Sequence, residues 1–172
     1  MNIFVVDECP INSAQQLCDK HVVKMVVEGC QMLSTIHRMF ASHVVYAPVE
    51  LYKESFRNHP CTIWARQTTS NYMWLADHTF TLSCEYTHRY GKTHKAHDMT
   101  RWFIQHIPGQ IPQGNLTPFA QAMPDKYKVF GDPVLAYRKY YVGEKSRFAK
   151  WTCNLQPQWY TDMLKSEVEM VA

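Results

Sequence analysis

The sequence lacks the features that mark several large classes of protein. Its six cysteines form no CxxC pair, and its nine histidines show no HxH or HExxH spacing, so we expect neither disulfides nor a metal site. No apolar run approaches the length of a membrane span, and residues 1–7 are too short and too soon acidic for a signal peptide. We therefore expect a cytoplasmic protein that does not enter membranes and uses no cofactor.

A strong net charge is absent as well. The formal net charge is +3 and the hydrophobic fraction is 46%, which is typical of a globular protein. Binding to a polyanion therefore requires local clusters of cations. The length of 172 residues suits one domain, so we expect residues 1–172 to form a single monomeric domain whose residues 161–172 are a flexible tail.

Helical periodicity dominates the first half of the chain and predicts one compact, mainly α domain. A short extended segment, residues 1–6, precedes a long first helix that starts at residues 12–13 and ends near residue 40. Residues 41–59 lack a sustained period. They predict a loop with a short helix at residues 51–56.

Helix caps and helix breakers divide the second half. Pro60 opens one helix, and a cap at residues 68–70 opens an aromatic helix that Gly91 ends. After a further amphipathic segment, the Pro-rich residues 108–133 predict a long loop that serves as a wall or lid. Asp132, followed by a proline, predicts the start of the last helical region.

A stripe of polar side chains runs along the predicted first helix. His21, Lys24, Glu28 and Gln31 follow one another at intervals of three, four and three residues, which places them on one helical face with apolar residues on both sides. A carboxylate, an imidazole and an ammonium group one turn apart can handle protons where burial tunes their pKa values. This favours a catalytic set over the alternative, an ion-pair ladder on an exposed face.

The segment before Pro60 carries a second candidate set. Asn58 and His59 stand at the entrance of the helix that Pro60 opens. There they can hydrogen-bond a base edge or a phosphate, with the helix N-terminus adding partial positive charge. The equally weighted alternative is a simple capping turn.

Two further segments mix cations with aromatic residues. Arg89 and Lys92 lie among tyrosines at the end of the aromatic helix, although Arg89 is also spaced to pair with Glu85. Arg138, Lys145 and Arg147 belong to a basic stretch, residues 137–151, that contains one acid and several aromatics. Such a mixture favours phosphate neutralisation and base stacking over a merely solvated face.

Several of these motifs resemble a known family. Asp19-Lys20-His21, then six residues, then Glu28 resembles the catalytic helix of the phage pyrimidine-dimer DNA glycosylases of the endonuclease V type. Phe56-Arg57-Asn58-His59-Pro60 is similar to a motif of the bacterial relatives, and residues 157–160 resemble the aromatic C-terminal motif of the phage enzymes. Nearly the whole chain also resembles a group of small tailed-phage proteins, a likeness that implies no function.

The glycosylase resemblance implies a mainly helical protein that kinks DNA and exposes a damaged or modified pyrimidine nucleotide. In it, Glu28 stabilises charge that develops on the sugar or positions a nucleophile. Two residues depart from the family pattern. The family uses the α-amine of a small residue exposed by Met removal, whereas Asn2 is large, so we expect Met1 to remain and borohydride trapping to give little adduct. Val27 replaces the arginine before the family's glutamate, so Lys24 or another residue must supply its contacts.

These observations predict a DNA-acting enzyme that processes a pyrimidine base by N-glycosylase-like chemistry. One alternative is a phage enzyme that transfers a group from a small-molecule donor onto a modified thymine, and another is a non-catalytic phage protein that binds nucleic acid or inhibits a host factor. The expected location is the cytoplasm of the infected cell. The expected catalytic residues are Glu28, His21 and Lys24. The expected substrate contacts are Asp19, Asn58, His59, Arg89, Lys92, Arg138, Lys145 and Arg147.

Overall fold

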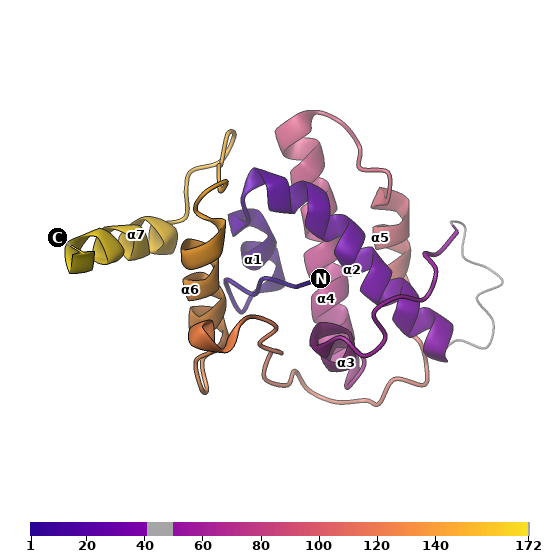
Figure 1. Cartoon of the computed structure of the whole chain (residues 1–172). Helices are drawn as coiled ribbons and strands as arrows, with labels where there is room; N and C mark the ends of the chain where they lie inside the picture. The colour runs from indigo at the N-terminus through magenta and orange to yellow at the C-terminus, as the bar shows by residue number, and fades with distance from the viewer. Residues whose placement is uncertain (41–49, 172) are drawn as a thin grey trace.

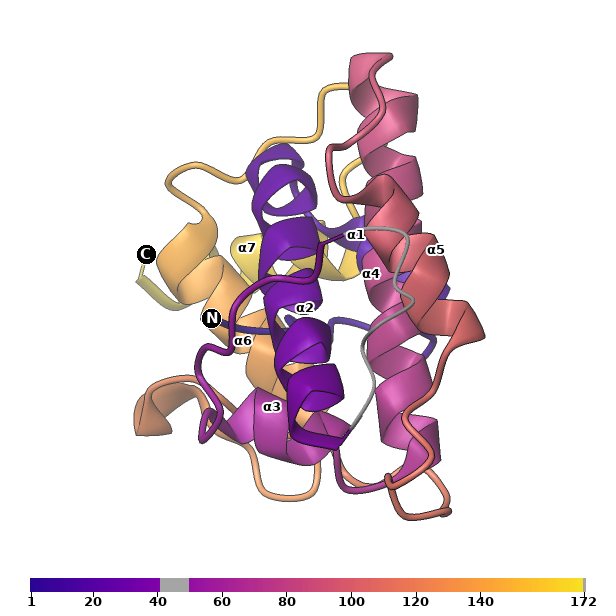
Figure 2. The same ribbon diagram turned by 90° about the vertical axis from the view of Figure 1, so that its right-hand side faces the viewer.

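The regular structure of the chain is helical in every part that our computed structural model describes, which is residues 1–40 and 50–171, with side chains up to residue 166. This confirms the mainly α fold. No helix among these residues combines the length and the apolar content that crossing a membrane requires. The helices, shown in Figures 1 and 2, are α1 (Pro10–Gln16), α2 (Asp19–Phe40), α3 (Pro60–Ala65), α4 (Thr69–Tyr90), α5 (His97–Gln105), the short 3₁₀ helix η2 (Asp125–Tyr127), α6 (Pro133–Lys145) and α7 (Gln158–Val171).

The centre of the fold is the pair of long helices α2 and α4, which pack against each other (Figure 2). They approach closely at Gly29, where an added Cβ would lie 2.2 Å from Oγ1 of Thr79. Only glycine fits at this point, so the crossing is specified by sequence. Helices α1 and α5 pack on α4, and α3 packs on both long helices. The crossing fixes the position of Glu28, the residue before Gly29.

The predicted single first helix is wrong, because the structure divides it into α1 and α2. Leu17 has extended backbone angles, with ψ at 147°. Arg89 of α4 donates to the carbonyl oxygens of Gln15 and Leu17 at 2.9 and 2.8 Å, and the amide of Cys18 donates to the Tyr141 hydroxyl at 2.8 Å. These tertiary hydrogen bonds satisfy the backbone groups that a continuous helix would use, and they outweigh the helical pattern.

Residues 1–9 form an irregular segment, with bends at residues 6–9, that joins the helical bundle to α6 (Figure 1). Val5 and Val6 are fully buried, and Arg138 of α6 donates from Nε to the Val6 carbonyl at 2.9 Å. The segment pairs with no strand in the described residues. Its role is to bring the end of α6 beside the first turns of α2.

The expected short helix at residues 51–56 is also wrong. Thr35 of α2 exchanges two hydrogen bonds with the backbone of Ser55, at 2.9 and 3.0 Å, and Arg38 donates to two further carbonyls of the segment. These side chains hold the segment without helical turns, since its carbonyls are already bound. Residues 41–49 of the same predicted loop lie outside the described residues.

Most expected helix boundaries are confirmed. The Thr68 hydroxyl accepts from the amide of Asn71, Gly91 ends α4 in the left-handed conformation with φ at 62°, and the Asp132 carboxylate accepts from the amide of Leu135. The Pro-rich residues 108–133 form a long connection whose one helical turn is η2. The expected tail is largely the helix α7, and its flexibility stays a prediction.

Candidate active site

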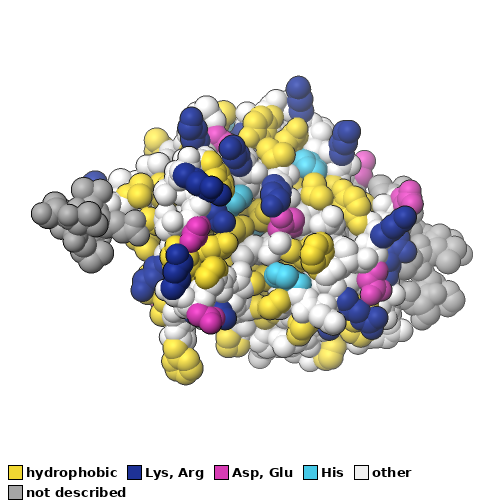
Figure 3. All heavy atoms as spheres, in the orientation of Figure 1, with side chains coloured by type: hydrophobic (Ala, Val, Ile, Leu, Met, Phe, Trp, Pro, Cys, Tyr) yellow, Lys and Arg dark blue, Asp and Glu magenta, His cyan; other side chains and the backbone are white. Residues whose placement is uncertain are grey.

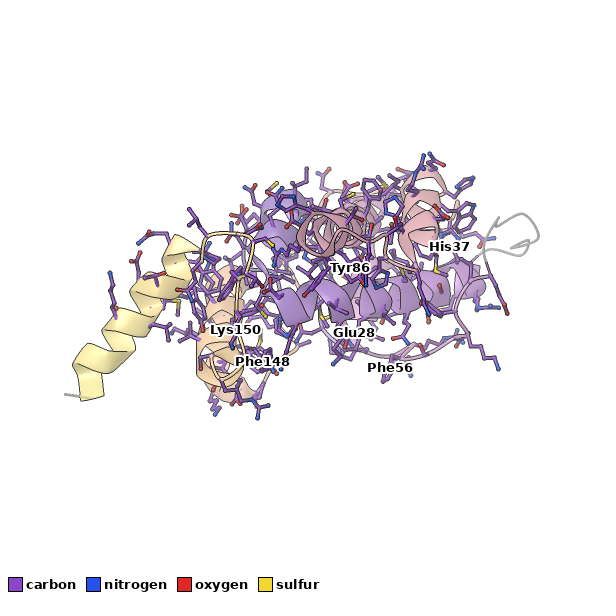
Figure 4. The ribbon with its side chains drawn as sticks, turned by 90° about the horizontal axis from the view of Figure 1, so that it is seen from above. Glu28, His37, Phe56, Tyr86, Phe148 and Lys150 are labelled. Atoms are coloured by element: carbon purple, nitrogen blue, oxygen red, sulfur yellow. The ribbon has the colours of Figure 1, made fainter. Side chains whose placement is uncertain are left out.

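A pocket of about 390 Å³ opens where the N-terminal segment, the first half of α2 and the end of α6 meet. It collects residues from the two ends of the sequence. In Figure 4, Glu28 and Phe148 lie on the same side of α2. The lining residues are Met1, Asn2, Phe4, Lys20, His21, Lys24, Met25, Glu28, Ala122, Tyr140, Lys145, Arg147 and Phe148.

Glu28 provides the carboxylate of this pocket and is only 8% exposed. Its Oε2 atom accepts from the backbone amide of Asn2 at 2.9 Å and lies 3.7 Å from the amino nitrogen of Met1. Its Oε1 atom lies 3.0 Å from Nζ of Lys24. Because donors and cations contact both oxygens, the carboxylate is fixed in one orientation beside the α-amine.

His21 belongs to a short chain of hydrogen bonds. The buried Tyr141 hydroxyl accepts from the Cys18 amide at 2.8 Å and lies 2.8 Å from Nδ1 of His21. With the amide as donor, the hydroxyl can donate its own proton to Nδ1 of His21 or to the Cys18 thiol, which also contacts it. When Nδ1 accepts from the hydroxyl, the ring proton of neutral His21 is on Nε2, which hydrogen-bonds no described residue.

The environment of His21 also keeps it neutral. Burial lowers its pKa to about 3, and the nearby cations Lys145 and Lys24 add to this effect. The Phe4 ring stacks on the imidazole with centroids 4.3 Å apart. At neutral pH, His21 therefore presents an N–H donor and no charge.

The N-terminal segment is shaped by Asn2. Its side-chain oxygen accepts from the amides of Ile3 and Phe4 at 2.7 and 3.1 Å, and its side-chain nitrogen donates to the carbonyl of Ala122 at 2.8 Å. Phe4 has a left-handed backbone with φ at 41°. This conformation is costly for a phenylalanine, and Asn2 and the stacked His21 stabilise it.

Four cations surround the pocket. Lys145 donates to the Tyr140 hydroxyl at 3.1 Å, and Lys20 and Arg147 lie over the Phe148 ring at 5.2 and 5.8 Å. Lys24 completes the group, with a side chain that is 69% exposed. Figure 3 shows Lys and Arg side chains around acidic and histidine side chains on this face. A rim of cations around a single buried carboxylate suits a ligand with an anionic backbone. The charged groups of such a ligand would bind the rim while an uncharged group enters the pocket.

His59 has the capping role that the sequence left open as one alternative, and its contact with a substrate stays a prediction. Its Nδ1 accepts from the Cys61 amide at 3.2 Å, so it caps α3. Its pKa is lowered by burial and by the N-terminal ammonium group, and the Glu28 carboxylate and the Met1 backbone oppose this shift. His59 therefore lies beside the Met1–Glu28 pair. Its neighbour Asn58 is exposed.

A comparison with protein families agrees with this arrangement. The family model described as pyrimidine dimer DNA glycosylase matches residues 1–103. The chain belongs to this family. The match includes His21, Lys24 and Glu28, whereas Lys145 and Arg147 lie outside it. No curated protein and no solved structure matches the chain.

Membership of the pyrimidine dimer DNA glycosylase family supports a glycosylase-like function with DNA as the substrate. Two predicted substrate contacts nevertheless have structural roles in this glycosylase-like chain. The Arg89 side chain is 1% exposed and lies 3.1 Å from carboxylates of both Asp19 and Glu85. Asp19 also accepts from the amide and hydroxyl of Thr152. Arg89 and Asp19 therefore tie α4 to α2 and to the C-terminal segment, and they do not face the pocket.

Arg138 and Lys92 do not line the pocket either. Arg138 donates to the Val6 carbonyl and lies over the Trp159 ring at 5.3 Å, because α6 turns this face toward the interior. Lys92 is exposed beyond the end of α4. Of the predicted cations in the second half of the chain, the structure brings only Lys145 and Arg147 to the pocket.

The aromatics of residues 137–151 divide between core and pocket. Tyr137 and Tyr141 are fully buried, and Trp151 donates from Nε1 to the Gln16 carbonyl. Tyr140 and Phe148 line the pocket. The spacing of four residues between the buried tyrosines is the signal that could have assigned them to a core-facing helix side.

Proposed function

We propose that the protein is a DNA glycosylase that cleaves the bond between C1′ and the base nitrogen of a pyrimidine nucleotide in its pocket. The observation that carries this proposal is the Glu28 carboxylate, buried and held beside the Met1 amine. When the bond breaks, its electron pair leaves with the base and positive charge develops on the sugar. A fixed carboxylate stabilises that charge without reorganising.

His21 would act at the other end of the same nucleotide. It precedes Glu28 by seven residues on α2, about 10.5 Å along the helix axis. Its Nε2 proton would be donated as a hydrogen bond to a carbonyl oxygen of the departing pyrimidine, where negative charge accumulates. Because His21 is neutral, it stabilises the leaving group as a hydrogen-bond donor and transfers no proton of an imidazolium.

The attacking group is either the Met1 amine or a water molecule beside Glu28. The geometry allows amine chemistry even when Met1 is retained, because the amino nitrogen of Met1 itself lies 3.7 Å from the Glu28 carboxylate. Attack by the amine at C1′ displaces the base, and loss of an amine proton with opening of the C1′–O4′ bond then gives an imine that borohydride reduces, whereas attack by water gives a free abasic sugar. Borohydride trapping therefore decides the nucleophile.

Base release from defined DNA tests the proposed function. We expect duplex DNA that carries a cyclobutane pyrimidine dimer, incubated with the full chain, to lose a pyrimidine–sugar bond and gain an abasic site. Mass spectrometry of the DNA before and after incubation measures this change. If the incubated DNA keeps all its pyrimidine–sugar bonds, or shows a pyrimidine with added mass, the glycosylase proposal is wrong.

The cationic rim predicts a salt-dependent signature of DNA binding. Replacing Lys145 or Arg147 by alanine removes one phosphate contact, so the slope of log affinity against log salt should fall by about one unit in each variant. The control is Lys165→Ala, an exposed cation on α7. Arg138→Ala should instead lower thermal stability, because its guanidinium is engaged inside the fold. Equal slopes in the Lys145, Arg147 and Lys165 variants would remove the rim from the DNA interface.

A further inference from the structure

Phe56 combines two properties that rarely occur together. Its backbone is left-handed, with φ at 54°, and its side chain is 59% exposed. A phenylalanine in this conformation is strained, and glycine or asparagine would fit with less cost. The exposed ring gains little packing in return. The fold therefore maintains a strained residue that does not contribute to the core.

The segments on both sides of Phe56 enforce its conformation. The preceding residue, Ser55, is fixed by its two hydrogen bonds with Thr35 of α2. The carbonyl of Phe56 accepts from the amide of His59 at 3.0 Å, directly before Pro60 opens α3. Strain that is determined by its surroundings in this way typically occurs at functional sites.

Phe56 is linked to the candidate site through His59. In Figure 4 the labelled Phe148, Glu28 and Phe56 lie along one side of the molecule. The turn that begins at Phe56 leads to His59. The pKa of the His59 imidazole is shifted by the Met1 ammonium group and by the Glu28 carboxylate, so His59 lies near both. The other non-glycine residue with a positive φ in the described part of the chain is Phe4, which lines the pocket. One of the two strained phenylalanines therefore lines the pocket, and the other begins the turn that leads to His59.

We propose that Phe56 is an aromatic wedge that enters the base stack of duplex DNA beside the pocket. This inference rests on the proposed function, because a nucleotide reaches the pocket only by leaving the stack. The ring replaces part of the stacking that the remaining bases lose. Because the ring is already fixed in an exposed position, its insertion costs no further conformational entropy on binding. The neighbouring exposed Lys53 suits an adjacent phosphate, and the exposed Arg57 lies 3.6 Å from the Glu54 carboxylate.

Base unstacking measures the wedge directly. The probe is a duplex with 2-aminopurine next to a pyrimidine dimer, bound by full-length protein that carries Glu28→Gln so that no base is lost. We expect binding to raise the 2-aminopurine fluorescence, and Phe56→Ala and Phe56→Gly to abolish the rise and weaken affinity by about 5- to 150-fold. The matched control, Phe130→Ala, removes a fully exposed phenylalanine whose backbone φ is not positive and should change neither quantity.

Thermal stability separates a wedge from a structural phenylalanine. Phe56→Gly relieves the left-handed strain and should raise the melting temperature by about 2–4 °C while it weakens DNA binding. A fall in melting temperature, or equal DNA behaviour of Phe56→Ala and Phe130→Ala, would overturn the wedge. Loss of the fluorescence rise in Phe56→Ala without base release by the unmodified protein would overturn the glycosylase and keep the wedge. Base release by the unmodified protein, together with an unchanged fluorescence rise in Phe56→Ala, would overturn the wedge alone.

Discussion

Glu28→Gln is expected to reduce base release by about 10²- to 10⁴-fold, the range of a positioned charged group in catalysis. Glutamine keeps the size of the side chain and can still accept from the Asn2 amide, so the pocket should keep its shape. It removes the negative charge that opposes the positive charge on the sugar and that pairs with the Met1 amine. The loss should therefore appear in the rate of the chemical step.

Single-turnover kinetics with excess enzyme measure that step, and DNA titrations measure binding separately. We expect the affinity of Glu28→Gln for DNA to change little or to rise, since a carboxylate near phosphates is lost. The control is Glu144→Gln, which removes a carboxylate that pairs with Lys126 on the surface. A Glu28→Gln protein that releases the base at the rate of the unmodified chain would disprove the proposed role of this carboxylate.

Local sequence patterns predicted the helical fold well because its boundaries depend on local chemistry. The Thr68 and Asp132 caps and the left-handed Gly91 each act within a few residues of their own position. The division between α1 and α2 was not predictable in this way. It depends on Arg89 and Tyr141, which are far away in sequence and bind the backbone around Leu17 and Cys18. A helical period cannot report hydrogen bonds made from other elements.

The same distinction applies to the candidate site. His21, Lys24 and Glu28 share one face of one helix, so their spacing alone placed them together. The sequence could not show that Met1 and Phe4 lie beside them, since the N-terminal segment has no period that fixes its position. Nor could it show that Arg89 is enclosed by carboxylates, because composition does not separate a buried cation from an exposed one.

Three buried histidines predict a steep loss of stability in acid. Burial lowers the pKa of His21 to about 3, of His37 to about 4 and of His78 to about 3. The two nearby lysines lower the pKa of His21 further, and the charge of His106 lowers that of His37 although a backbone hydrogen bond opposes it. Among the described residues, the imidazole Nε2 of His78 has no hydrogen-bond partner, so no bond at this atom offsets the cost of charging the ring.

The sign of the effect follows from the unfolded state, in which each imidazole has its ordinary pKa of about 6.5. Below that pH the unfolded chain binds protons that the folded chain cannot, so the stability is complete above about pH 6.5 and falls as the pH decreases toward 3–4. Each group contributes about 1.4 kcal/mol per pH unit in this window. Between pH 6.5 and 4.5 the three together remove roughly 7 kcal/mol, comparable with the total stability of an ordinary domain.

Urea unfolding at pH 7.5 and 4.5 tests this expectation with a matched pair of variants. His78→Leu removes one of the three titrating groups while it keeps an apolar contact for the Trp74 ring, which stacks on His78 at 5.0 Å. It should reduce the difference in unfolding free energy between the two pH values by about a third. The control, His88→Leu, replaces an exposed histidine of the same helix and should leave the difference unchanged. An unmodified protein that is equally stable at both pH values would show that these histidines accept protons inside the fold, and His21 would then be available as an acid rather than as a neutral donor.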